Sequence, residues 1–245
     1  MTAQTWPSWL ESEAEVKTHI GSRHKKELAI IKNLLGVFWA GFASMSSSAD
    51  PRQGDQLDVG WTLLTVRSFD SLACAYDLLQ RGYYSQAMAL TRSVDEDWLT
   101  CKDCIKSSET LATLRGEGER QQQRMPKYAD MARRLDEPYN KEWWDSIYGW
   151  NSKFAHARYL ALRQLLHPTM NGVIVGSYYD SDAFLVSCYL LVASAIRMAG
   201  VLMQLLQRVI SPVPKTWLKE LELVLQQAEV WLRSVEHKLW SFPES

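Results

Sequence analysis

The sequence predicts an all-α fold, a bundle of about six or seven helices, and three observations favour it. Apolar residues recur at three- and four-residue steps through most of the 245 positions, which is the spacing of one helix face. Gly and Pro interrupt this pattern where helices are expected to end. Only one stretch resembles a strand, GVIVGSYY over 172–179, and we expect it to be a short extended connection or a small hairpin.

The first half of the chain divides at clear helix signals. Ser8 followed by Glu11 fits a capping box, in which each side chain hydrogen-bonds the backbone of the other residue. Gly82 follows an apolar run and suits a helix end. The expected elements are a long helix, broken or continuous, over 8–43, a flexible linker over 44–56, and helices over 57–81 and 83–106.

The second half begins with a polar, charge-mixed segment over 107–137, where we expect only a short helix near 126–135. Pro138 suits the first position of a helix because its missing N–H is not needed there. Further helices are expected over 138–166, 181–209 and 214–240, with Pro212 and Pro214 between the last two. In domain terms, 1–56 is an N-terminal helix with a flexible linker, and 57–245 is the bundle.

Composition excludes several classes of protein. The formal net charge is −1, which argues against a dedicated nonspecific nucleic-acid binder, because such proteins need an excess of Lys and Arg, and we expect no DNA partner. The first residues show no apolar leader, and four cysteines in a chain of this length suggest reduced thiols. Both observations favour a cytoplasmic protein.

Metal and cofactor sites are not expected. Cys101 and Cys104 form a CxxC pair, but no further ligands follow at zinc-site spacing, so we interpret them as ordinary thiols. The Glu-x-x-His pairs of a di-iron bundle and the glycine-rich phosphate loops of nucleotide-binding proteins do not occur in the sequence.

A 24-residue stretch over 183–206 carries Arg197 as its one formal charge, so hydropathy alone would permit a membrane span. A helix surrounded by other helices is equally apolar. We expect the buried-core alternative and no membrane association, because Arg197 lies near the middle and no second such span is evident.

The candidate site combines polar residues from two predicted helices. Arg92 and Glu96 lie four residues apart, on a helical stripe with apolar neighbours, so their charges require compensation. The helix predicted over 138–166 offers Asn151, Ser152 and His156 as partners. In one interpretation Arg92, Glu96, Ser152 and His156 form a structural network; in the other, all five residues form an active site.

Two stretches together resemble a known family. They are LLQRGYYSQAMALTRSVDEDW over 78–98 and WNSKFAHAR over 150–158. Their Arg-x-x-x-Glu and Ser-x-x-x-His patterns are similar to those of bacterial HEPN-like helical proteins of unknown function. The resemblance spans roughly 57–210 and implies a HEPN-like bundle and a homodimer.

Ribonucleases of the broader HEPN class carry an Arg, often an adjacent polar residue, and a later His at a dimer interface. By this resemblance His156 matches the histidine and Asn151 the polar residue, but Trp150 occupies the position of the arginine. We therefore expect a non-catalytic protein that acts through protein interaction, in stress or phage defence. The alternative is a metal-independent endoribonuclease that acts on RNA, with His156 moving the proton, Arg92 stabilising the phosphate charge, and Glu96 and Ser152 positioning them.

Overall fold

The computed structural model describes residues 6–46, 56–114, 125–135, 176–210 and 212–239. These residues form eight helices and no strand, so the all-α prediction is confirmed for the described part of the chain. The helices are α1 (Trp6–Arg23), α2 (Lys25–Ser46), α3 (Gln56–Gln80), α4 (Tyr84–Lys106), α5 (Ser108–Leu114), α6 (Tyr128–Arg133), α10 (Ser181–Val209) and α11 (Lys215–Leu239).

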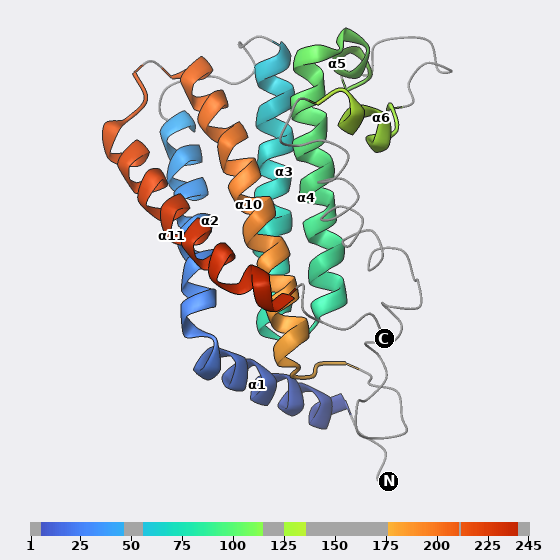
Figure 1. Ribbon diagram of the computed structural model, residues 1–245, viewed down its shortest axis with the longest axis vertical. Helices are drawn as coiled ribbons and strands as arrows, with labels where there is room; N and C mark the ends of the chain where they lie inside the picture. The colour runs from blue at the N-terminus through green and yellow to red at the C-terminus, as the bar shows by residue number, and fades with distance from the viewer. Residues whose placement is uncertain (1–5, 47–55, 115–124, 136–175, 211, 240–245) are drawn as a thin grey trace.

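Helices α2, α3, α4 and α10 run side by side in the bundle, and α10 lies at its centre (Figure 1). Helix α10 contacts α2, α3, α4 and α11, and the most extensive contact between any two helices joins α3 and α4. Helix α11 packs on α2 and α10, whereas α1 lies across one end of the bundle (Figure 1). The core is therefore organised around α10, and α2 on one side and α3 and α4 on the other contribute to it.

Helix α11 shows how the sequence directs this packing. Its buried residues alternate in steps of three and four, which places them on one stripe that faces α2 and α10. The other faces of α11 carry mostly charged and amide side chains, together with the exposed Leu223 and Val230. The buried stripe consists of Trp217, Leu221, Val224, Ala228, Trp231 and Val235.

The turn between α3 and α4 depends on Gly82, as the sequence predicted. Its φ is +76°, a conformation that side-chain-bearing residues rarely adopt. A Cβ at this position would lie 2.1 Å from the carbonyl oxygen of Tyr178. The absence of a side chain therefore lets the turn pack directly against the backbone that precedes α10, where Ser177 donates a hydrogen bond to the Arg81 carbonyl.

The start of α10 and its apolar character follow from its surroundings. The Asp180 carboxylate caps the helix by accepting hydrogen bonds from the backbone N–H groups of Asp182 and Ala183, both at 2.9 Å. Two described helices are long and apolar enough to cross a membrane, α2 over Lys25–Met45 and α10, so the expectation that no second such stretch occurs was wrong. In α10, 67% of the most apolar window is buried by the protein itself, against 44% in α2.

Several boundaries differ from the predicted ones. The long N-terminal helix is broken at His24, and α2 continues to Ser46, into the predicted linker. The prediction of only one short helix over 107–137 was wrong, because α5 forms there as well. The Ser107 hydroxyl accepts the backbone N–H of Thr110 at 3.3 Å and so caps α5.

Other predicted elements agree with the structure or lie beyond its described part. The helices predicted over 57–81, 83–106, 181–209 and 214–240 correspond to α3, α4, α10 and α11 within one residue at each end. Residues 176–179 are a non-helical connection, and 172–175 lie outside the described residues, as does the helix predicted over 138–166. The predicted domain boundary near residue 56 falls between α2 and α3. Both helices contribute residues to the same hydrophobic core.

Candidate functional site

The predicted pair on α4 is formed. Arg92 Nε donates a hydrogen bond to Glu96 Oε1 at 2.9 Å, and the two side chains are only 17% and 19% exposed. Met88 and Leu99, on the same stripe, are fully buried. The carboxylate thus compensates the guanidinium within one helix, as the four-residue spacing predicted.

Tyr128, the first residue of α6, adds a second contact to this pair. Its pKa is raised to about 12, chiefly by burial and then by the negative charges of Glu96 and Asp97. Its hydroxyl also hydrogen-bonds the Glu96 carboxylate, which keeps the phenol protonated. Glu96 is therefore held by a cation from its own helix and by a phenol from α6.

Asp97 connects α4 to α3. Its fully buried carboxylate accepts hydrogen bonds from both Nε and Nη2 of Arg67, the former at 3.1 Å, and from Ser68 Oγ at 2.9 Å. Burial raises the pKa of Asp97, and the Arg67 guanidinium and the Ser68 hydroxyl offset part of that rise. The Arg67 side chain itself is 64% exposed, so this pair extends from the interior to the surface.

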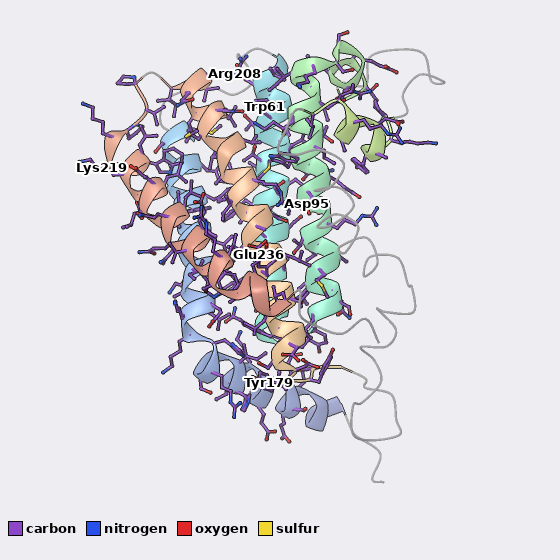
Figure 2. All side chains as sticks on the ribbon, in the orientation of Figure 1. Trp61, Asp95, Tyr179, Arg208, Lys219 and Glu236 are labelled. Atoms are coloured by element: carbon purple, nitrogen blue, oxygen red, sulfur yellow. The ribbon has the colours of Figure 1, made fainter. Side chains whose placement is uncertain are left out.

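Asp95 connects α4 to the central helix. Its carboxylate accepts hydrogen bonds from Ser194 Oγ at 2.7 Å and from Arg197 Nη2 at 2.5 Å, and Arg197 also donates to Ser194 at 2.9 Å. All three side chains are buried. Figure 2 marks Asp95 on α4 beside α10. Arg197, the one charge within the apolar stretch of α10, is thus neutralised inside the protein.

Asp103 connects α4 to the two short helices. Arg134 donates two hydrogen bonds to its carboxylate, at 2.7 and 2.5 Å, and Thr110 Oγ1 of α5 donates a third at 2.5 Å. Burial alone would raise the pKa of Asp103, but the hydrogen bonds from Arg134 and Thr110 outweigh it and lower the pKa. The carboxylate is consequently ionised and fully engaged.

These contacts form what we term the α4 acid ladder, defined by Asp95, Glu96, Asp97 and Asp103 with their arginine partners. Each carboxylate is matched by one guanidinium from α10, α4, α3 or the end of α6. Paired in this way, the acids fix the register of α10, α3 and α6 around α4. The described residues contain no group of three His, Cys, Asp or Glu side chains placed to hold a metal ion.

The structure describes only part of the predicted site. Arg92 and Glu96 meet on α4, whereas Asn151, Ser152 and His156 lie outside the described residues, so their proximity to Arg92 stays a prediction. Cys101 and Cys104 are free thiols, both buried, and burial raises the pKa of Cys101 well above its ordinary value. A buried thiol of this kind is a poor nucleophile.

Sequence reasoning missed most of the α4 acid ladder. It singled out Glu96 but not Asp95, Asp97 or Asp103, because these acids look like the solvated face of a helix. A signal was present: Asp95 directly follows Val94, and Asp103 lies between two cysteines. Arg197, the one formal charge of the apolar stretch over 183–206, required a carboxylate partner, and these acids were available.

A second feature is an exposed apolar surface on α2 and α3, which we term the α2–α3 apolar face. Trp39 is 66% exposed, Leu63 67% and Val66 40%. The Trp39 ring lies 6.2 Å from that of Phe69, and Phe69 meets Phe42 edge-on at 5.6 Å, so the face continues inward to the core. Large exposed apolar groups on neighbouring helices are typical of interaction surfaces.

No protein-family model, curated protein or solved structure matches this chain.

Proposed function

We propose that this protein is a non-catalytic, HEPN-like helical protein that acts through protein interaction in the cytoplasm, in stress or phage defence. We further propose that its working form is a homodimer joined through the α2–α3 apolar face. The single observation that carries this proposal is the 66% exposure of Trp39 on α2, with Leu63 and Val66 exposed on the neighbouring α3. Tryptophan is the residue type most enriched at energetically important interface positions, and leaving it in water is unfavourable.

The α4 acid ladder supports the non-catalytic part of the proposal. A catalytic arginine must be available to a phosphate, but Arg92 already donates to Glu96, and Glu96 is also held by Tyr128. The other acids of the ladder are each matched by a guanidinium. Charges that satisfy one another in this way stabilise helix packing and have little free capacity for a substrate.

A photo-crosslinking experiment tests the proposed surface. The photoreactive amino acid p-benzoyl-phenylalanine is placed at position 39, on the α2–α3 apolar face, or at position 230 on α11 as a matched control, since Val230 is similarly exposed at 63%. We expect a crosslinked species of twice the chain mass from position 39 alone. Equal crosslinking from both positions, or none from position 39, would reject this face as the contact between copies.

The alternative is a metal-independent endoribonuclease, and one observation favours it. The Arg67 side chain is 64% exposed, and its guanidinium feels the charge of Glu96, the carboxylate that pairs with Arg92, so both cations act on one acid of α4. Guanidinium groups match phosphate oxygens in pairs. In this alternative His156 would transfer the proton, and Arg92 would stabilise the charge that develops on the phosphate.

Cleavage of end-labelled structured RNA in the presence of EDTA separates the two functions. The comparison uses wild type, His156→Ala, and Arg233→Ala as a matched control at an 82% exposed side chain of α11. The proposed function predicts no cleavage by any of the three proteins. Cleavage by wild type and Arg233→Ala that is lost in His156→Ala would instead establish the endoribonuclease.

A further inference from the structure

His24 occupies the break between α1 and α2. Its backbone N–H donates to the Ile20 carbonyl at 2.9 Å, and its own carbonyl accepts from Leu28 at 3.0 Å, so backbone hydrogen bonds continue through the break. The chain nevertheless changes direction there, because α1 lies across the end of the bundle while α2 runs along it (Figure 1). His24 is therefore the pivot between an arm and the bundle.

The His24 side chain is buried at this pivot, with 8% of the residue exposed. Its Nε2 lies 3.1 Å from the hydroxyl of Tyr179, in the connection before α10. Its ring stacks on Phe184 of α10, with centroids 4.0 Å apart and planes 22° from parallel. One imidazole thus joins the start of α2 to both the α10 helix and the segment that leads into it.

Tyr179 also receives two side chains from α1 itself. The His19 ring meets it edge-on at 4.4 Å, and the Arg23 guanidinium lies over it at 5.9 Å. Figure 2 marks Tyr179 at the end of the bundle that α1 crosses. The end of α1 is therefore held largely through this one tyrosine and the imidazole of His24.

The remaining contacts of α1 are mostly polar. Glu13 accepts hydrogen bonds from Arg81 at 2.9 Å and from Tyr83 at 3.0 Å, and Lys17 lies 3.5 Å from Asp77. Ile20 is the single buried residue among the α1 side chains that the structure describes. The Glu13 side chain is only 14% exposed, whereas the Lys17–Asp77 pair lies at the surface, where such a contact contributes little. With a single buried residue, α1 can separate from the bundle at lower cost than the core helices.

Charged and titratable groups surround His24 from each neighbouring element. Burial lowers the pKa of His24 from 6.5, Glu27 on α2 opposes this, and Arg23 and His19 on α1 add to the lowering. The Glu27 carboxylate is 3.9 Å from Nδ1 and is the one acid at this distance among the described residues.

Two further elements contribute groups that do not ionise at neutral pH. Tyr84 of α4 packs edge-on against Phe184 at 6.5 Å, and burial raises its pKa. Burial raises the pKa of the Cys188 thiol on α10 well above its ordinary value, and the negative charge of Glu27 adds to this rise. Neither group supplies a charge that would compensate an imidazolium.

We propose that His24 is an acid-sensitive latch that holds α1 across the end of the bundle while its imidazole is neutral and releases α1 when the imidazole is protonated. Protonation would place a cation in a buried site beside Arg23 and His19, against a single carboxylate. Release returns the imidazolium to water and uncovers Tyr179 and Phe184, which form an aromatic surface with Tyr84. This inference does not depend on the proposed function.

The direction of the pH effect follows from the lowered pKa. Because the latched state binds the proton more weakly than the released state, the stabilisation of the latched state is complete above pH 6.5. It is lost as the pH falls from 6.5 through the lower pKa of the latched His24. The Glu27 carboxylate raises the pKa of His24 and so opposes the loss of the latched state at low pH, so removal of that carboxylate should enlarge the loss.

Hydrogen–deuterium exchange of the full chain, followed by mass spectrometry, tests the latch at about pH 7.5 and about pH 5.5. Exchange in α1 is expressed relative to α11 in the same sample, so that the intrinsic pH dependence of exchange cancels. We expect the relative protection of α1 in wild type to fall several-fold at the lower pH. Unchanged protection in wild type would overturn the proposal.

Three variants identify the titrating group. His24→Gln cannot gain a proton in this range and offers an amide oxygen to Tyr179, so its α1 protection should be equal at both pH values. His19→Gln removes one of the groups that lower the pKa of His24, so its loss of α1 protection should be smaller than that of wild type but still present, and Glu27→Gln should show a larger loss. Equal losses in wild type and His24→Gln would contradict the proposal.

A second measurement covers the case in which His24→Gln fails to hold α1 even at neutral pH. The imidazole resonance of His24 is then followed by NMR in the wild-type protein, together with an amide signal from α1. The latch requires both to change at the same pH. A change of the α1 signal at a pH where the His24 resonance is unchanged would overturn it.

Discussion

Replacing Arg197 by methionine tests the most deeply buried pair of the α4 acid ladder. The side chains of Asp95 and Arg197 are 0% and 7% exposed, and the guanidinium lies 2.5 Å from the carboxylate. Arg197→Met keeps an apolar chain of similar length in α10 but leaves the Asp95 carboxylate in the protein interior without this cation. Removing one partner of a buried ion pair costs about 3–5 kcal/mol, a large part of the roughly 5–15 kcal/mol that stabilises a typical domain.

Two further variants separate the pair from general effects of substitution. The double variant Asp95→Leu with Arg197→Met removes both charges, and we expect it to be more stable than Arg197→Met alone, because no uncompensated charge remains. Arg233→Met alters a surface pair with Glu229 whose atoms are 4.0 Å apart and whose side chains are 82% and 54% exposed. This control should cost less than about 1 kcal/mol.

Urea unfolding followed by circular dichroism measures these differences through the midpoint and the slope of the transition. We expect an equal slope in all variants and the largest loss of unfolding free energy in Arg197→Met. The reasoning would be refuted if Arg197→Met cost no more than Arg233→Met, or if the double variant were no more stable than Arg197→Met.

Three further predictions follow from other parts of the fold. Gly82→Ala should destabilise the protein by more than about 1 kcal/mol, because a Cβ in this positive-φ turn would lie 2.1 Å from the Tyr178 carbonyl oxygen. Gly36→Ala in α2, where a Cβ would meet open space, should be neutral or stabilise the protein by up to about 1 kcal/mol. Thermal unfolding measures both changes. Hydrogen bonds lower the pKa of Asp103 below 3.8, so the stabilisation that the ionised carboxylate gives the protein is complete above that pH and is lost as the pH falls through the lower value. The urea midpoint of Asp103→Asn should therefore decline less steeply than that of wild type between about pH 5 and about pH 2. Parallel declines would contradict this assignment. Of the four thiols only Cys74 is exposed, so a thiol reagent should label one cysteine rapidly in the native protein and all four in denaturant; rapid labelling of Cys101 would argue against its burial.

Periodicity was sufficient to predict the long helices. The bounds of α3, α4, α10 and α11 follow from apolar spacing together with Gly82 and the prolines near 212. Helix α5 was missed because seven residues are too few for a periodic pattern, and it forms through the Ser107 cap and the contact of Thr110 with Asp103. Short helices of this kind depend on tertiary contacts that spacing does not encode.

The candidate site was predictable only where its contacts are local. Arg92 and Glu96 are four residues apart, so helical geometry alone brings them together. Asp95 pairs with Arg197, which is 102 positions away in the sequence, and Asp97 pairs with Arg67, which is 30 positions away. These pairings can be predicted only from how the helices pack. His24 illustrates the same limit, because its partners Tyr179 and Phe184 approach it only in the folded bundle.

The molar mass of the protein in solution tests the central proposal most directly. Light scattering over a range of concentrations is applied to wild type, to the double variant Trp39→Gln with Val66→Gln, and to Val230→Gln as the control on α11. We expect twice the 28.1 kDa of one chain for wild type and Val230→Gln, and the mass of one chain for the double variant. A single-chain mass for wild type at high concentration, or a dimer that persists in the double variant, would contradict the account.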